Sequence, residues 1–536
     1  MYFFYYYIIS LAILGYGYLL NSYLRIDTKN EGIIGLNGIF LLILISYIST
    51  FILPHNFIFN LIVLSFGLLS LFFYVFYKKH RFNYFLHLLV FIVLFVFVLS
   101  GKNHDDFGYY HFPYTHILTQ YSHPIGLGVL NNGFRNPSSL FYLNSLFYLP
   151  KIDYYLLHIG SAFFLGYTNL FLIRNIFNKK NFKQSKFFNL LNLVFFIFTN
   201  LVFYRMSEYG TDRTGQILVI LIFINLIYLI NIKNDDNFDL FKFLVLIGCI
   251  TISLKPFYLI YFLLIFYFVF NKDLRFYFFQ TIKSRVLILS FTFISFSFLI
   301  TFLNSGCLIF PLSFTCFENL SWATSKLHVG EVRDWYELWS KGGANPNFTV
   351  EDRITYVSNF NWIPNWIENY FFNKVSDFLL SLIIILLIIY FTLRSKKKLN
   401  LLDKKYRILY LYLIFFLVEW FINHPTLRYG GFHLFALLIF IPLSMGLEKY
   451  ELDWNLYFKR SMVLITIVLI IFVSRNSFRL NKEYRVYNYN IFENLNFKFI
   501  GGNENYYLRY NTQIKNKNFN YEYTNVFGKK ILIIKR

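Results

Sequence analysis

The sequence predicts an all-α protein built as a polytopic transmembrane bundle of about fourteen helices. Hydrophobic residues make up 57% of the 536 residues and charged residues only 15%, and the mean hydropathy is +0.48. The apolar residues gather in runs of about 15 to 24 residues, long enough to cross roughly 30 Å of hydrocarbon. This composition excludes a soluble multidomain protein.

Each apolar run is expected to form one helix. The runs place spans near residues 2–20, 33–53, 56–77, 84–100, 153–173, 187–206, 216–232, 239–254, 256–271, 286–304, 375–393, 406–422, 433–447 and 460–474. The two runs that flank Lys255 and Pro256 are the shortest pair, and the proline would either kink one long helix or mark a re-entrant pair. The run at the amino terminus lacks a basic segment and a cleavage site, so we expect it to be retained as the first span.

These spans define a transmembrane domain over residues 1–474 with two long loops, 101–152 and 305–374. Residues 475–536 follow the last span and predict a small extramembrane appendage with some strand. The formal charge of +22 comes mainly from short loops between spans. Cations in such loops orient helices, so we expect membrane lipids and not nucleic acid as partners.

Basic loops alternate along the chain, as the positive-inside rule requires. Every second loop is rich in Lys and Arg, namely those near residues 25–29, 78–81, 174–186, 233–242, 272–285 and 394–407. We assign this side to the cytoplasm of a bacterial cell membrane, which puts the amino terminus outside. The same parity puts the tail outside, whereas Arg475 and Arg479 directly after the last span favour the cytoplasm.

All polar motifs fall on the opposite, extracytoplasmic side, where we expect them to build one site. The first of these motifs is the acidic pair Asp105 and Asp106, which follows a span directly. Carboxylates at a membrane boundary are costly and indicate function. One Asp would act as general base, while the other orients the acceptor or holds a divalent cation, Mg²⁺ or Mn²⁺. The alternative is a solvated start of the loop.

Four histidines crowd the same loop, and His111 is a candidate substrate contact. Their spacing fits no compact metal site, so we predict interfacial polar histidines and no metal ligands among them. Downstream, the segment PSSLFYLNSLFYLP carries apolar residues on most faces. It predicts a short helix along the outer membrane interface, where a lipid tail would rest.

Three further strings carry candidate phosphate ligands. In SEYGTDRTG, Asp212 and Arg213 are either a helix cap with a solvated ion pair or a site in which Arg213 or Arg205 contacts phosphate. Lys255 stands between two apolar segments and either snorkels or binds an anion.

The string NHPTLRYGGFH supplies His424, Arg428 and a glycine pair that permits close backbone approach. Arg offers a fixed bidentate fork and His can donate to a leaving oxygen, so the string suits phosphate or pyrophosphate. The alternative is a tight turn with an interfacial arginine.

The 305–374 loop holds five of the seven tryptophans and more acidic than basic residues. Tryptophan stacks on sugar faces and also anchors helices at membrane interfaces, and the sequence leaves both roles open. Cys307 and Cys316 lie nine positions apart in this loop. They are expected to form a disulfide if the loop faces an oxidising compartment.

The acidic pair in HDDFGYYH and the plan of the whole chain resemble the GT-C superfamily of polytopic glycosyltransferases. Typical members place the acids after the first helix, whereas three further spans precede them here. The strings SEYGTDRTG and NHPTLRYGG also look like those of a bacterial family of multi-pass membrane proteins of the same general plan.

The resemblance implies inverting transfer from a polyprenyl-phosphate-sugar donor to an extracytoplasmic acceptor. Asp105 or Asp106 would deprotonate the acceptor, and Lys255 and Arg428 would stabilise the departing phosphate. One alternative is a polysaccharide polymerase or ligase that relies on Arg and His. Another is a transporter or flippase of a lipid-linked or anionic solute, with Lys255 at a broken helix as its substrate site.

Overall fold

The computed structural model is helical almost throughout. It describes residues 1–80, 82–100, 106, 110–207, 210–231, 237–345, 348–394, 406–487, 521–526 and 529–534. Within that part the one sheet is a hairpin, in which β1 (Tyr521–Val526) pairs antiparallel with β2 (Lys529–Ile534). The expected appendage after the spans therefore contains strand.

The first half of the chain forms thirteen named α-helices. They are α1 (Tyr2–Leu24), α2 (Glu31–Ser49), α3 (Phe57–Phe72), α4 (Tyr84–Leu94), α5 (Val96–Leu99), α6 (Phe112–Gln120), α7 (Leu127–Leu130), α8 (Ser139–Ser145), α9 (Gly160–Ile176), α10 (Lys179–Gln184), α11 (Lys186–Val202), α12 (Gly210–Asn231) and α13 (Asn237–Leu254). A π-helical turn, Phe73–Tyr77, extends α3.

The second half continues with α14 to α23 and several short helical turns. They are η4 (Pro256–Leu263), α14 (Leu264–Phe270), α15 (Lys272–Ile282), α16 (Arg285–Ser305), α17 (Lys326–Lys341), α18 (Arg353–Val357), α19 (Ile363–Trp366), η7 (Ile367–Val375), α20 (Ser376–Leu393), α21 (Arg407–Asn423), η9 (Leu427–Tyr429), α22 (Gly431–Glu448) and α23 (Trp454–Tyr487).

Nine of the described helices are long and apolar enough to cross a membrane, or ten if the bent pair Pro256–Phe270 and Leu274–Ile282 counts as one span. The predicted count of about fourteen is not confirmed. Several predicted spans fall on shorter helices. The run 153–173, for example, becomes the 17-residue α9 because the chain turns repeatedly before Gly160.

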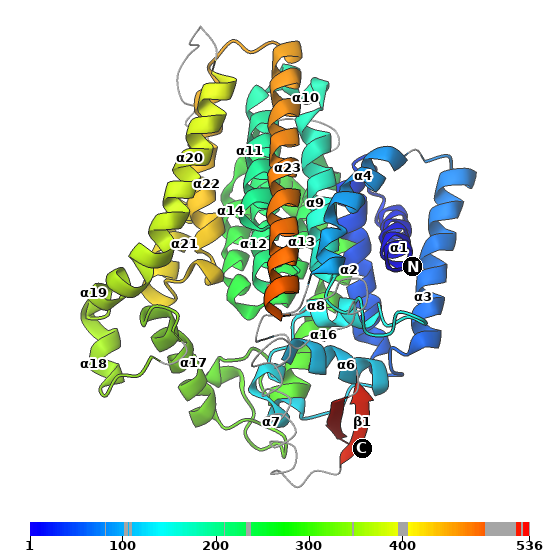
Figure 1. Cartoon of the computed structure of the whole chain (residues 1–536), viewed down its shortest axis with the longest axis vertical. Coiled ribbons are helices and arrows are strands. Elements are labelled where there is room, and N and C mark those ends of the chain that lie inside the picture. The colour runs from blue at the N-terminus through cyan, green and yellow to red at the C-terminus, as the bar shows by residue number, and fades with distance from the viewer. Residues whose placement is uncertain are drawn as a thin grey trace.

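The basic loops meet at one end of the bundle. Lys242 donates a hydrogen bond to the carbonyl of Arg25 at 3.0 Å, and Arg460 donates to that of Arg394 at 3.2 Å. In Figure 1 this end lies at the top for α10 and α20, whereas α6, α7 and α17 lie at the bottom. The fold thus separates the basic loops from the polar motifs, and we expect the basic end to face the cytoplasm.

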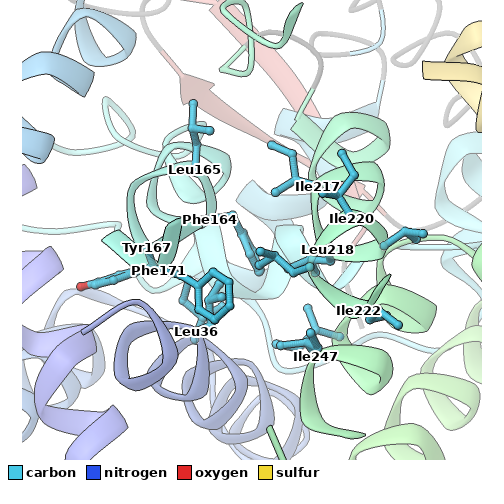
Figure 2. Close-up of a cluster of buried hydrophobic side chains, with 14 of the residues drawn as sticks. Leu36, Phe164, Leu165, Tyr167, Phe171, Ile217, Leu218, Ile220, Ile222 and Ile247 are labelled. Carbon is cyan, nitrogen blue, oxygen red and sulfur yellow. The ribbon is translucent and has the colours of Figure 1, made fainter. Parts of the chain in front are cut away.

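The core is centred on α12, whose residues are buried along almost the whole helix. Figure 2 shows Leu218 of α12 beside Phe164 of α9, with Leu36 of α2 and Ile247 of α13 nearby. All four side chains are 0% exposed. Because protein covers α12 on every side, its amino-terminal turn has a fixed position at the motif end.

The segment expected along the outer interface is instead buried inside the protein. Its helix, α8, packs against α2, α6 and α9, and none of its residues is exposed. The Ser145 hydroxyl bonds to the His55 ring at 2.7 Å. The prediction that this helix lies at the membrane interface and contacts a lipid tail was wrong. A helix that is apolar on most faces can pack equally well against protein or lipid, so the sequence pattern did not distinguish the two.

The pair at Lys255 and Pro256 forms two separate elements. The backbone of Lys255 is extended and directly follows Leu254, the last residue of α13. Pro256 is the first residue of η4. The last helix, α23, is longer than predicted and runs toward the end that holds α17 and the hairpin (Figure 1). The end of α23 therefore lies on the side of the polar motifs, where the parity of the predicted spans places the tail. The guanidinium of Arg475, within α23, lies 3.6 Å from the centre of the Tyr204 ring and donates a hydrogen bond to the Leu201 carbonyl. Groups of the protein thus stabilise the cation at this position.

The arrangement predicts how cysteine probes will label. In intact cells Lys180→Cys, on exposed α10, should be protected from an impermeant maleimide. Ser321→Cys, exposed in the 305–374 loop, should react. Permeabilised cells provide the control, because both probes should then react. Labelling of Lys180→Cys from outside would reverse the assigned orientation.

Candidate functional site

Four charged side chains from distant parts of the chain form one network at the motif end. Asp212 pairs with Lys255 through one carboxylate oxygen and with Nε of Arg428 through the other. Nη2 of Arg428 also contacts a carboxylate oxygen of Asp106 at 2.7 Å. The structure therefore brings together an acid of the first long loop and three of the candidate phosphate-site residues.

Burial differs along this charge network. The side chain of Asp212 is 6% exposed, whereas that of Asp106 is 26% exposed. Asp212 lies in the first turn of α12, where the helix dipole favours a negative charge. The hydroxyl of Tyr258, in η4, donates to the Asp212 carbonyl at 2.7 Å and ties η4 to this turn. Asp212 is the inner, fixed carboxylate and Asp106 the outer one.

Arg428 is positioned by hydrogen bonds between its turn and four other elements. Trp366 and Trp420 donate their indole N–H groups to carbonyls of the turn at 2.8 and 2.7 Å. Gln216 of α12 donates to the Arg428 carbonyl at 2.8 Å, and the hydroxyl of Tyr370 accepts from a backbone N–H at 2.9 Å. These hydrogen bonds fix the backbone of the turn and so fix the position of the Arg428 Cα, from which the side chain reaches the carboxylates.

The two glycines after Arg428 have a packing role in this structure. Gly430 has a φ of 156°, which side-chain-bearing residues rarely adopt. A Cβ on Gly431 would lie 2.8 Å from atoms of Trp420 and Leu427. The glycine pair thus lets the turn close against Trp420, whereas the sequence had suggested a close approach to phosphate.

The charge network lies at the polar end of a cavity of about 2410 Å³ that Asp106, Lys255 and Arg428 all line. The other end of the cavity is an apolar trough between α13, η4 and α16. The trough residues include Leu244, Val245, Gly248, Ile252, Leu259, Phe262, Phe291, Ile294 and Phe298. Phe262 and Phe291 are 57% and 72% exposed, so the trough opens on the apolar surface of the bundle.

Helix α17 covers the polar end and is called the roof here. A disulfide joins Cys307 to Cys316, with their Cα atoms 3.9 Å apart, and residues 309–312 of the enclosed loop line the cavity. Both cysteines pack with Phe310 and with Val329 of the roof in a small apolar cluster separate from the main core. The disulfide thus joins the two ends of the loop on which Val329 of the roof packs.

His424 lines the same cavity and is neutral at physiological pH. Burial, opposed by Glu337 and assisted by Lys341, lowers the pKa of His424 to about 4. Its Nδ1 atom is buried and has no hydrogen-bond partner among the described residues. A neutral imidazole offers one N–H donor and one acceptor, so His424 can hydrogen-bond a leaving oxygen but is not a cationic acid.

For Arg428 the balance of effects is reversed. Burial opposes its charge, but Asp212 and Asp106 outweigh that effect and hold the pKa of Arg428 well above its ordinary value. The guanidinium is a permanent cation at this position.

Two candidates lie away from the network. The guanidinium of Arg213 is 5.9 Å from the centres of both the Phe203 and Phe432 rings and does not line the cavity, whereas Arg205 does. His111 packs against Phe141 at 4.9 Å between ring centres, next to the cavity-lining Tyr110. Asp105 lies outside the described residues.

No group of three or more His, Cys, Asp or Glu side chains in the described part of the chain is arranged to hold a metal ion. The expectation of Mg²⁺ or Mn²⁺ depends on Asp105 as well as Asp106, and so it stays a prediction. The ion pair with Arg428 shows how the charge of Asp106 is neutralised without a metal.

A family model described as a domain of unknown function, DUF8201, matches residues 1–436. The chain belongs to the DUF8201 family. All four charged residues of the network lie within the matched part. No curated protein and no solved structure matches the chain.

Sequence reasoning did not single out several cavity residues of this DUF8201 protein. Tyr110, Tyr336, Glu337 and Tyr429 all line the cavity near the network. With 71 Phe and 45 Tyr in the chain, an individual aromatic residue carries little signal. Glu337 was one of many acids in its loop, and only its position on the cavity-facing side of the roof distinguishes it.

The network predicts a large stability cost for removing its inner carboxylate. Asp212→Ala would remove a buried carboxylate and leave the partly buried Lys255 and Nε of Arg428 without their partner, at a cost of roughly 3 kcal/mol. Adding Lys255→Met should recover part of that loss, because one uncompensated charge is removed as well. Thermal unfolding in detergent measures both effects.

A matched control is Asp334→Ala, which breaks an exposed pair with Arg333. Exposed pairs contribute about 0 to 1 kcal/mol, so its unfolding temperature should stay near the parental value. Equal unfolding temperatures for Asp212→Ala and the parent would contradict the assigned network.

Proposed function

We propose that this DUF8201 protein is an integral membrane glycosyltransferase. It would move a sugar from a polyprenyl-phosphate donor to an acceptor on the extracytoplasmic face of the membrane. The observation that carries the proposal is one cavity with two chemically different ends. Arg428 and Lys255 lie at the polar end, and an apolar trough leads from there to the lipid-facing surface.

A polyprenyl phosphate matches these two ends. Its phosphate suits the cations Lys255 and Arg428, and its chain suits the trough, where transfer of apolar surface from water is favourable. A soluble nucleotide-sugar donor would leave the trough empty. A small anionic solute would likewise leave it unused, so the trough favours a lipid-linked substrate over transport of a free anion.

The two carboxylates take different roles in the proposed reaction. Asp212 holds both cations from the inner side and is committed to them. Asp106 contacts the outer Nη2 of Arg428 and lines the cavity. A donor phosphate that takes over this outer contact would release Asp106 to accept the proton of the acceptor hydroxyl.

The direct test substitutes this outer carboxylate. Asp106→Asn keeps the shape and should preserve donor binding while lowering turnover by about 10² to 10⁴. The measurement is transfer of label from a polyprenyl-linked sugar pool in membranes that carry the variant. Asp334→Asn, on the exposed side of the roof, is the control and should transfer at the parental rate.

The outcome also separates the other two functions. A polymerase or ligase built on Arg428 and His424 would tolerate Asp106→Asn but lose activity with Arg428→Ala. A transporter would move solute without forming a glycosidic bond and would depend on Lys255. Parental transfer by Asp106→Asn would show that the carboxylate mechanism is wrong.

The trough provides a second prediction. Gly248 lies in α13 on the trough wall, and a Cβ built there meets no atom within 4 Å. Gly248→Leu should therefore fit without a clash while filling space meant for the lipid chain. We expect the KM for a long-chain donor to rise about 10-fold, with a smaller effect on a short-chain analogue.

The matched control is Gly446→Leu in α22, where a Cβ also meets nothing within 4 Å and which does not line the cavity. Its KM should stay at the parental value for both donors. If Gly248→Leu and Gly446→Leu behave alike, the lipid chain lies elsewhere.

A further inference from the structure

Much of the roof helix α17 lines the cavity, including Val332, Tyr336 and Glu337. His328, Glu331, Trp335 and Trp339 also line it at spacings of three or four residues, so they share one face of the helix. Trp335 is 44% exposed, which is unusual for so large an apolar side chain. Asp334, which does not line the cavity, is exposed and pairs with Arg333.

The other tryptophans of the 305–374 loop have structural partners. Trp366 is buried and donates to the turn that holds Arg428, and Trp362 is 1% exposed and packs against it. Trp322 donates to the carbonyl of Phe302 at 3.4 Å. Trp335 and Trp339 differ from these three, because both line the cavity.

The two remaining indoles form a stacked pair. The ring centres of Trp335 and Trp339 are 6.5 Å apart with an interplanar angle of 26°. The ring of Trp339 also lies 5.7 Å from that of Tyr429, which neighbours Arg428 in the chain. The Nζ atom of Lys255 is 5.9 Å from the centre of the Tyr429 ring. The pair therefore lies one aromatic ring away from the charge network.

A membrane anchor does not explain this pair. The roof is a charged helix and is not one of the described helices that are long and apolar enough to cross a membrane. Its two tryptophans face the cavity that also contains the charge network. Apolar ring faces that border a polar cavity are favourable only when something covers them.

Polar groups line the same cavity as the stacked pair. Glu337 lines the cavity and pairs with Lys341 at 2.5 Å. Asn423 and the neutral His424 line it from the end of α21. A pyranose ring has a C–H face that packs on an aromatic ring and hydroxyl groups at its edge that need hydrogen-bond partners. The roof supplies the first surface, and Glu337, Asn423 and His424 supply the second.

We propose that Trp335 and Trp339 form the sugar-binding subsite of this cavity, a platform on which one pyranose ring stacks. The inference deepens the proposed transfer reaction by naming the residues that hold a sugar. Binding to the platform does not need a donor or a reaction. Its test is therefore a binding measurement whose result is independent of transferase activity.

The experiment uses the full-length protein in detergent and follows its tryptophan fluorescence during titration. The probes are the methyl glycosides of glucose, galactose, mannose and N-acetylglucosamine, with sorbitol as a polyol that lacks a ring. We expect at least one glycoside to change the emission saturably and sorbitol not to. Trp339→Ala should weaken that binding about 3- to 10-fold.

Conservative variants distinguish stacking from a loss of packing. Trp339→Phe keeps an aromatic face and should retain most of the affinity, whereas Trp339→Leu keeps apolar bulk only and should behave like Trp339→Ala. Trp454→Phe, at the basic end of the bundle, is the control and should bind as the parent does. Unchanged thermal unfolding of the Trp339 variants would show that the roof remains folded.

A further titration assigns the bound sugar to donor or acceptor. Displacement of the glycoside by a polyprenyl-phosphate sugar, but not by polyprenyl phosphate alone, places the donor sugar on the platform. Failure of both to displace it places the acceptor there. Absence of saturable binding by every glycoside, or equal affinities for Trp339→Leu and Trp339→Phe, would overturn the proposal.

Discussion

The pairing of Arg428 with two carboxylates is the interaction on which the motif end of this protein depends. A guanidinium cannot shed its proton, so in a poorly hydrated site its charge must be met by acids or by a ligand. Asp212 meets it from α12 and Asp106 from the first long loop. Lys255 closes the network on the inner side. The network thereby connects three helix junctions and one loop, and its contact between Asp106 and Arg428 joins residues 322 positions apart in the sequence.

The sequence was informative about these charges because the surrounding chain is so apolar. Each of Asp106, Asp212, Lys255 and Arg428 stands at the boundary of an apolar run, where an ionisable group is expensive and so carries signal. The alternation of basic loops predicted that these boundaries share one side, and the structure groups them at one end. Which acid is fixed and which faces the cavity could not be predicted, since that depends on burial by segments far away in the chain.

The sequence was less informative about apolar segments, because nothing in their composition shows which partner they contact. A helix surrounded by protein and a helix facing lipid have the same hydropathy, which explains both the misplaced interfacial helix at Ser139–Ser145 and the uncertain number of spans. The same holds for aromatic residues, because Phe and Tyr occur throughout the chain. Trp362 is buried against Trp366 and Phe421, whereas Trp335 is open to the cavity, and this difference depends on tertiary packing that the sequence does not show.

The unequal burial of the two carboxylates gives the site a direction. Asp212 is too enclosed to exchange its partners, and so Lys255 and Arg428 keep their positions whether or not an anion is present. Asp106 is more exposed and contacts the outer side of Arg428, where a phosphate that entered in the proposed reaction would compete with it. In the proposed reaction this competition would link the arrival of the donor to the freeing of a carboxylate. A base would then become available only once the donor phosphate is bound, so deprotonation of the acceptor would be coupled to the presence of the leaving group that Lys255 and Arg428 stabilise.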